Sequence, residues 1–367
     1  MASRQRKQEQ EDASSEIIEV APNVLRLQLP IRFTGLGHVN CYALEDADGF
    51  ALMDPGMPGR KSYKALGSRL DAAGIPLSKV HSVIVTHSHP DHFGGAKWLQ
   101  EKSGGAEIIT SSSFRSWWDP ASKDEDTDAE GPLASRGREL GPVDMETARS
   151  PFGPAPWRSA SSASVSARLQ RVAFRMMARQ AKRWMHTPTP TKRLEDAEVI
   201  KLARSEWVAV HTPGHTPDHL CLFNPADGSL FSGDHVLPQI TPHVGGPAAG
   251  SPSGGDVLAD YIESLRRMDA LEGASNVLPA HGHPFADLMR RVDEILAHHD
   301  HRLEMLRMNA QELGGEASVQ QLTRRMFKPR QWGMMAESEV YAHLEHLRIT
   351  GRAACREEGN ALLYRVE

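Results

Sequence analysis

The segment from Thr86 to His92 constrains this chain most, because it gathers three histidines and an aspartate into one short loop. It follows the apolar run 82–85, which predicts a buried strand, and it precedes residues 93–99, which predict a turn opening a helix. Imidazoles and a carboxylate at the end of a buried strand are costly to desolvate unless a charged group holds them together. A divalent metal ion does this, so the loop predicts a metal site; a histidine-rich surface loop is the alternative interpretation.

The spacing within this loop divides its side chains into two sets. His87 and His89 are two residues apart, so they can point the same way from an extended loop and share one ion. Asp91 and His92 lie about one turn further on and can reach a second ion nearby. A mixture of imidazole and carboxylate suits zinc, although manganese and iron accept the same ligands. We therefore expect two divalent ions, zinc in the first instance.

Three more strand ends carry residues that bind metals. The apolar run 207–210 leads to His215 after a short loop, the run 230–232 leads to Asp234, and the run 276–280 ends at His281. Four strand ends with a ligand-type residue at each are far more specific than any single motif.

This set resembles the metallo-β-lactamase superfamily, whose motif H-x-H-x-D-H is followed by a histidine, an aspartate and a histidine. The resemblance runs from about residue 23 to residue 283 and is interrupted by one long insertion. It implies an α/β (α+β) fold, a four-layer αββα sandwich. It also implies ligands for the first metal (His87, His89, His215), ligands for the second (Asp91, His92, His281) and a carboxylate that bridges both ions (Asp234).

The physics of a two-metal site agrees with this assignment. A bridging carboxylate lowers the repulsion between two dications about 3.5–4 Å apart, and a water held between them has a pKa that falls toward ~7. We expect Asp91 and Asp234 to be the catalytic residues, because both would ligate metal and orient the hydroxide that attacks a carbonyl carbon.

Other polar residues near these motifs have two interpretations each. The resemblance implies that Asp54 orients a ligand histidine, whereas its sequence Asp-Pro-Gly is also that of an ordinary turn. His219 either hydrogen-bonds near the substrate site or is a satisfied core histidine. The remaining histidines are expected to be structural where they flank the ligand loops (His211, His235, His243, His283) and solvated where they lie on a long helix (His298, His299, His301).

Particular residues separate the branches of the superfamily. Asp234 argues against antibiotic hydrolysis, and His89 stands where flavin-linked di-iron members carry glutamate. The closest resemblance is to the glyoxalase II-like group of thioester, ester and lactone hydrolases and to the lactamase-beta-like branch, although Asp218 replaces a glycine usual in glyoxalase II. Two alternatives stay open: an endoribonuclease that grips RNA with the basic stretch 168–183, and a mononuclear iron dioxygenase acting on a persulfide.

The composition indicates an enzyme in a reducing compartment. A chain of 367 residues can form one sizeable sandwich and a small second domain, and its net charge of −5 gives no general attraction to nucleic acid or anionic membrane. Its three cysteines, Cys41, Cys221 and Cys355, cannot build a disulfide framework, so we expect a cytoplasmic location. Residues 1–16 predict a loose tail, and no run approaches the ~18 apolar residues of a membrane helix, so no integral membrane association is expected.

The insertion, about residues 111–192, is the part of the chain that least resembles the superfamily. Its acidic tract 123–130 predicts a solvated loop. Residues 163–186 hold six basic side chains, no acid and apolar residues at helical spacing, which predicts an amphipathic helix. That helix is either a lid beside the metals or a packing helix.

The remainder of the chain predicts a second domain. After a catalytic domain at 17–295, helices are expected at 284–313, 318–323 and 337–349, followed by a two-stranded ribbon at 352–356 and 361–366. This order is winged-helix-like and assigns residues 296–367 to a C-terminal domain. Glu337, Glu339 and Glu345 oppose DNA binding by the third helix, so packing or homodimerisation is the expected role. The expected partner of the whole chain is a small-molecule acyl substrate, with RNA kept as an alternative.

Overall fold

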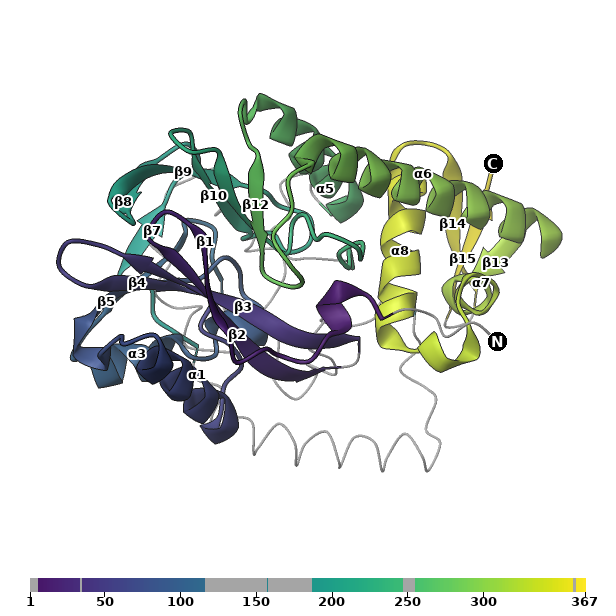
Figure 1. Cartoon of the computed structure of the whole chain (residues 1–367). Coiled ribbons are helices and arrows are strands. Elements are labelled where there is room, and N and C mark those ends of the chain that lie inside the picture. Colours follow the sequence, from purple (N-terminus) through teal and green to yellow (C-terminus); the bar gives the residue numbers. More distant parts are fainter. Residues whose placement is uncertain (1–5, 34, 116–156, 158–186, 247–254, 359–360) are drawn as a thin grey trace.

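The computed structural model describes residues 6–33, 35–115, 157, 187–246, 255–358 and 361–367. The acidic tract and the amphipathic helix expected in the insertion lie outside these residues. Two β-sheets stack face to face with helices on their outer sides, which gives the four-layer sandwich that the sequence predicted (Figure 1). No helix in the described ranges is both long enough and apolar enough to cross a bilayer.

The first sheet has seven strands that are hydrogen-bonded in chain order. Its first four strands pair antiparallel, and the last four, β4 to β7, pair parallel to one another. Helices α1 (Arg60–Ala72) and α3 (Ala96–Ser103) cover its outer face, with the single turn α2 (Pro90–Phe93) and the 3-10 turn η2 (Leu77–Lys79) between them in the chain (Figure 1). The strands are β1 (Ile17–Ala21), β2 (Val24–Phe33), β3 (Leu36–Glu45), β4 (Phe50–Met53), β5 (Val80–Ile84), β6 (Glu107–Ser111) and β7 (Lys192–Leu194).

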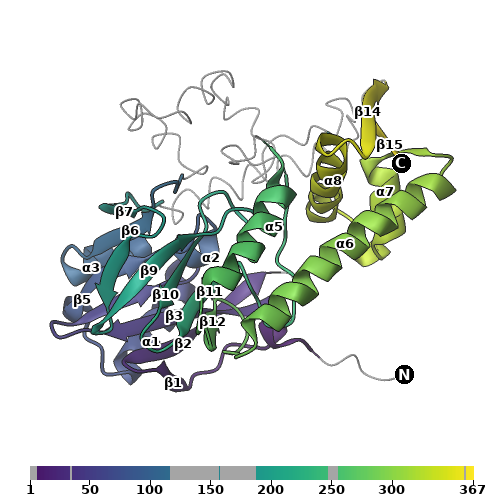
Figure 2. The same cartoon turned by 90° about the horizontal axis from the view of Figure 1, so that it is seen from above.

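The second sheet has five strands in the order β12-β11-β10-β9-β8. All its pairs are antiparallel except β11 with β12. Figure 2 shows α5 (Val257–Arg267) and α6 (Leu288–Glu312) along the outside of this sheet. The 3-10 turn η4 (Met268–Ala270) ends α5. The strands are β8 (Val199–Leu202), β9 (Ser205–His211), β10 (Leu220–Asn224), β11 (Ser229–Gly233) and β12 (Asn276–Pro279).

Alternation along each strand assigns its side chains to two different cores. Tyr42 of β3 enters the core between the sheets, where its ring centroid lies 5.0 Å from that of Phe231, and Phe231 in turn stacks on Trp207 at 4.7 Å. The preceding residue Cys41 points the other way and packs in the cluster that holds Leu66 of α1. Strands that are apolar on both faces are therefore buried on both faces, as the continuous apolar runs in the sequence indicated.

The C-terminal part contains the three helices and the ribbon that the sequence predicted, with one addition. A three-residue strand, β13 (Glu316–Ser318), pairs with the ribbon to give the sheet order β13-β15-β14. It is too short to show a period in the sequence. Helix α6 covers residue 295, so it spans the expected domain boundary, and that boundary stays a prediction. The other elements are α7 (Val319–Met326), the 3-10 turn η5 (Pro329–Gln331), α8 (Met334–Ile349), β14 (Ala353–Glu358) and β15 (Ala361–Val366).

The described part of the segment before β1, residues 6–16, differs from the loose tail that its composition suggested. Residues 8–10 form the 3-10 turn η1 (Gln8–Gln10), and the side chain of Glu9 is fully buried. Its Oε1 accepts hydrogen bonds from the backbone N–H groups of Gln239 (2.6 Å) and Ile240 (2.9 Å). A buried carboxylate needs such donors, and they fix the segment to the sandwich.

One histidine on α6 also differs from its expected position. His299 is buried and its ring stacks on that of His343 in α8, with Nδ1 of His299 3.0 Å from Nε2 of His343. The expectation of a solvated face was wrong for this residue. His299 lies four residues from both Ile295 and Leu303, so it shares their apolar side of the helix, whereas His301 is exposed.

Candidate metal centre

The structure brings together all seven residues that the sequence assigned to metal binding. They follow the ends of four strands, β5, β9, β11 and β12, and they form two groups whose ligand atoms lie within 4.8 Å of one another. The first group is His87, His89, His215 and Asp234, and the second is Asp91, His92 and His281.

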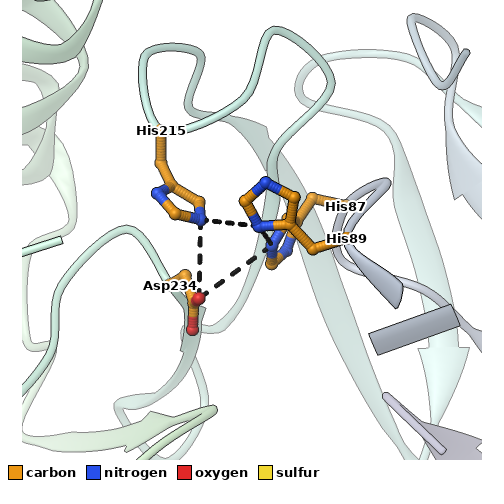
Figure 3. A group of neighbouring side chains, drawn as sticks. All are labelled: His87, His89, His215 and Asp234. Atoms are coloured by element: carbon orange, nitrogen blue, oxygen red, sulfur yellow. Dashed lines mark hydrogen bonds and ion pairs between the residues drawn. The ribbon is translucent and has the colours of Figure 1, made fainter. Parts of the chain in front are cut away.

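Three imidazoles of the first group point their ring nitrogens at a common point (Figure 3). Nδ1 of His89 lies 3.0 Å from Nε2 of His87 and 3.1 Å from Nε2 of His215. Oδ2 of Asp234 lies 4.0 Å from Nε2 of His87 and 3.5 Å from Nε2 of His215. Burial, together with the neighbouring histidines, holds the pKa of His87 and of His89 well below the usual value, so both rings are neutral and offer lone pairs.

The second group shares Asp234 with the first. Oδ2 of Asp91 lies 3.7 Å from Nε2 of His92 and 3.6 Å from Nε2 of His281. Asp234 completes this group through both oxygens, with Oδ2 3.6 Å from Nε2 of His92 and Oδ1 3.3 Å from Nε2 of His281. The position of Asp234 between the groups is the one expected of a carboxylate that serves two ions.

The donor atoms of this centre fit divalent ions. Nε2 of His92, Nε2 of His281 and Oδ1 of Asp234 are buried, and no hydrogen-bond partner for them occurs in the part of the chain that the structure describes. Buried polar atoms without partners cost free energy, and several that face one another are compensated together by a cation. Burial would raise the pKa of Asp234, but His281 and His92 hold it well below the usual value, so the carboxylate is ionised as a ligand must be.

Asp54 orients a ligand histidine, which decides between its two interpretations. Its Oδ2 lies 2.8 Å from Nδ1 of His92, and it accepts two hydrogen bonds from Thr86, one from the backbone N–H (2.9 Å to Oδ1) and one from the hydroxyl (2.8 Å to Oδ2). Asp54, the residue after β4, has a positive φ of 51°. A carboxylate behind the ring fixes its orientation and directs Nε2 at the metal position.

Backbone carbonyls orient two more ligands, and the sequence gave no indication of either. Nδ1 of His281 lies 2.6 Å from the carbonyl oxygen of His38, and Nδ1 of His215 lies 2.7 Å from that of His243. Each carbonyl requires a proton on Nδ1, so Nε2 keeps the lone pair that a metal needs. Every residue has a carbonyl group, so residue type could not have identified these two.

His219 lies beside the ligand group and contacts the backbone of Asp234. It is buried, its Nε2 accepts a hydrogen bond from the backbone N–H of Asp234 (3.0 Å), and its Nδ1 lies 2.7 Å from the hydroxyl of Thr212. A Cβ atom at Gly233 would lie 2.5 Å from Nε2 of His219, so only glycine allows this approach. Both ring nitrogens therefore have protein partners, as in a satisfied core histidine.

Asp218 ties two of the ligand loops to each other. The hydroxyl of Ser88, between His87 and His89, donates to Oδ1 of Asp218 at 3.0 Å. Burial raises the pKa of Asp218 to about 6, although the hydrogen bonds from Thr216 and Ser88 act in the opposite direction. A glycine at this position would leave Ser88 without that acceptor.

The sequence of the whole region decides the family. Residues 34–281 match the profile of the metallo-beta-lactamase superfamily. The chain belongs to this superfamily. A probable metallo-hydrolase, YqjP of Bacillus subtilis (strain 168), is 24% identical over 359 residues, which are 94% of this chain and 98% of that protein. The likeness to YqjP therefore extends beyond the sandwich into the C-terminal part.

Solved structures share the same architecture. A metallo-beta-lactamase family protein from Thermus thermophilus is 26% identical with a TM-score of 0.70, covering 95% of this chain and all of that one (100%). A beta-lactamase domain protein from Burkholderia ambifaria is 26% identical with a TM-score of 0.73, covering 97% of this chain and 96% of that one.

An atrochrysone carboxyl ACP thioesterase of Aspergillus fumigatus is 32% identical over 155 residues, which are 39% of this chain and 34% of the relative. This chain thus matches about a third of that thioesterase.

Proposed function

We propose that this metallo-hydrolase binds two divalent metal ions and hydrolyses a small acyl thioester, ester or lactone. Hydroxide adds to the carbonyl carbon, and the acyl C–S or C–O bond breaks to free a thiol or alcohol group. The observation that carries the proposal is the position of Asp234 between two groups of ligand atoms. Each group contains both imidazole nitrogens and a carboxylate oxygen. One such group would hold one ion; two groups that share a carboxylate suit a pair.

The ions, when bound, supply Lewis-acid stabilisation of a carbonyl oxygen and an attacking water that is deprotonated at neutral pH. The residues of the chain set the geometry in which this occurs. Asp54 and the carbonyl oxygens of His38 and His243 hold three imidazoles in fixed orientations. Asp91 and Asp234 would both ligate metal and orient the attacking hydroxide toward the carbonyl carbon.

Zinc is the ion that we propose first. Four of the seven ligands bind through Nε2 of histidine, one through Nδ1 and two through carboxylates, a set that zinc favours and that manganese and iron also accept. The described cysteines do not contribute, because Cys41 and Cys221 are buried in the sandwich and Cys355 lies on β14.

A thioester is the substrate class that we propose first. The Aspergillus relative is named an atrochrysone carboxyl ACP thioesterase, and its match, although partial, reaches 32% identity. Esters and lactones present the same electrophilic carbonyl carbon, so they belong in the same test.

The test is a screen of the zinc-loaded protein. It includes acyl thioesters of glutathione, coenzyme A and an acyl carrier protein, together with lactones, simple esters, a persulfide and single-stranded RNA. We expect about two zinc ions per chain by elemental analysis and turnover of at least one thioester, with His281→Ala losing both an ion and the turnover. A single iron with oxygen consumption on the persulfide, or RNA cleavage with steep salt dependence, would overturn the proposal.

A further inference from the structure

The carbonyl oxygen that orients His215 belongs to a segment without regular structure. Residues 237–246 follow Asp234 and belong to no helix or strand. Arg291 of α6 holds the start of this segment, since its guanidinium donates to the carbonyl oxygens of Leu237 and Ile240 at 2.7 Å each. A segment with no ladder of its own depends on contacts of this kind for its position.

Helix α8 holds the other end of the segment. Oε2 of Glu339 lies 3.8 Å from Nδ1 of His243, and Oε1 of the same carboxylate lies 3.4 Å from the guanidinium of Arg302 in α6. The hydroxyl of Ser338 lies 3.5 Å from the carbonyl oxygen of Gly246, which it approaches as a donor. A Cβ atom at Gly245 would lie 2.5 Å from both the His243 ring and the Ser338 hydroxyl, so the segment and the helix are packed without space between them.

These contacts form a continuous path from the C-terminal helices to one ligand. Glu339 contacts the His243 side chain, the His243 carbonyl accepts from Nδ1 of His215, and Nε2 of His215 faces His89 and Asp234. The ligand that the path orients, His215, belongs to the first ligand group and not to the second. The second group has its own acceptors, Asp54 and the His38 carbonyl, and both lie in the first half of the chain.

We propose that Glu339 is a positioning residue for the ion held by His87, His89 and His215, acting through His243 on the orientation of His215. The proposal rests on the two-metal centre proposed above. The side chain of Glu339 is 19% exposed, and a carboxylate so enclosed is costly unless its partners are kept in place. Its partners come from two sides, Arg302 from α6 and His243 from the segment beside the metals, so the carboxylate fixes one relative to the other. The C-terminal helices then help to position one ligand of the metal centre without contacting that ligand themselves.

The experiment measures zinc affinity in two backgrounds, by competition with a chromophoric chelator. His281→Ala leaves the first ligand group intact, and His89→Ala leaves the second intact. Glu339→Gln and Glu339→Ala are introduced into each background in the full-length chain. The matched control is Glu345→Gln, which removes an acid from the same helix, where Glu345 pairs with Arg348 and accepts from the hydroxyl of Tyr364 instead of facing His243.

We expect Glu339→Ala to weaken zinc binding about 10–100-fold in the His281→Ala background, with a smaller loss for Glu339→Gln. Neither should change zinc binding in the His89→Ala background, and Glu345→Gln should change it in neither. Equal losses in both backgrounds, or no loss in either, would overturn the proposal and leave Glu339 a purely structural residue. Wild-type protein that binds no zinc would instead refute the proposed function itself. Thermal denaturation of each metal-free variant separates a folding defect from a selective loss of one ion.

Discussion

Oδ2 of Asp54 lies 2.8 Å from Nδ1 of His92, which places a buried carboxylate behind a ring whose Nε2 faces Asp91 and Asp234. The same carboxylate receives the backbone N–H and the hydroxyl of Thr86, the residue that opens the ligand loop. One side chain at the end of β4 therefore fixes both the ring and the start of the loop that carries it.

Replacing Asp54 by asparagine should weaken metal binding at the second ligand group. An amide has one acceptor oxygen and no charge, so it cannot serve His92 and both donors of Thr86 together. Loss of such an orienting partner typically costs about 10–100-fold in metal affinity. Chelator competition measures the effect, and Asp48→Asn, at an exposed position in the bend that precedes β4, is the control. Equal affinities for Asp54→Asn and wild type would show that the carboxylate is dispensable.

Replacing Asp234 by alanine should have a larger effect. This variant removes the oxygen that faces His87 and His215 and the oxygen that faces His281, so both groups lose a ligand atom. We expect at least one of two metal ions to be absent by elemental analysis and hydrolytic activity to fall by more than about 100-fold, beyond the loss typical of an orienting partner. A variant that retains two ions and most of its activity would contradict the bridging role.

The residues of the candidate metal centre could be predicted from the sequence, because both their residue type and their position after a strand indicate a metal site. Each group of ligand residues follows the end of an apolar strand within a few residues, as His87, His215 and Asp234 do. The strand ends lie close together in the fold, so these side chains meet. The carbonyl oxygens of His38 and His243 could not be predicted in this way, because their role depends on backbone position alone.

Contacts between residues far apart in the chain also could not be predicted from the sequence. Nothing in the sequence near Glu339 connects it with His243, and the connection appears only when α8 lies beside residues 237–246. His299 is different, since its spacing from Ile295 and Leu303 predicts an apolar face, and only its polarity suggested solvent. At position 299 the helical spacing of the apolar residues therefore predicted burial better than the residue type did.

Trp157, a described residue of the long insertion between β6 and β7, should contribute to stability through α8. Its ring centroid lies 4.6 Å from that of Tyr341, and its indole N–H donates to Oε2 of Glu337 at 3.0 Å. We expect Trp157→Phe, which keeps an aromatic ring, to lower the free energy of unfolding by about 1 kcal/mol, and Trp157→Ala by about 3 kcal/mol or more. Urea denaturation measures both. An unchanged midpoint for Trp157→Ala would mean that the contact of Trp157 with α8 does not stabilise the folded chain.

The buried pair of Asp256 and His346 should make part of the stability depend on pH. Nδ1 of His346 lies 3.1 and 3.0 Å from the two oxygens of Asp256, which also caps α5 by accepting from the N–H of Ala259 at 2.9 Å. Burial would raise the pKa of Asp256, but the hydrogen bonds from His346 and the backbone hold it below its usual 3.8. The folded state therefore binds fewer protons at this site than the unfolded chain. Its contribution to stability is present above pH 3.8 and is lost as the pH falls through the lowered pKa.

Asp256→Asn should consequently lower the free energy of unfolding by about 1 kcal/mol near neutral pH, because a neutral hydrogen bond replaces a charge-assisted one. Asparagine is as good an N-cap as aspartate, so the helix end itself is preserved. Denaturant titrations between pH 7 and pH 3 should show the difference from wild type shrinking below about pH 4. Asp287→Asn is the control, since that residue precedes α6 without a side-chain cap hydrogen bond, and it should show no such trend. A difference that stays constant or grows toward pH 3 would contradict a lowered pKa at Asp256.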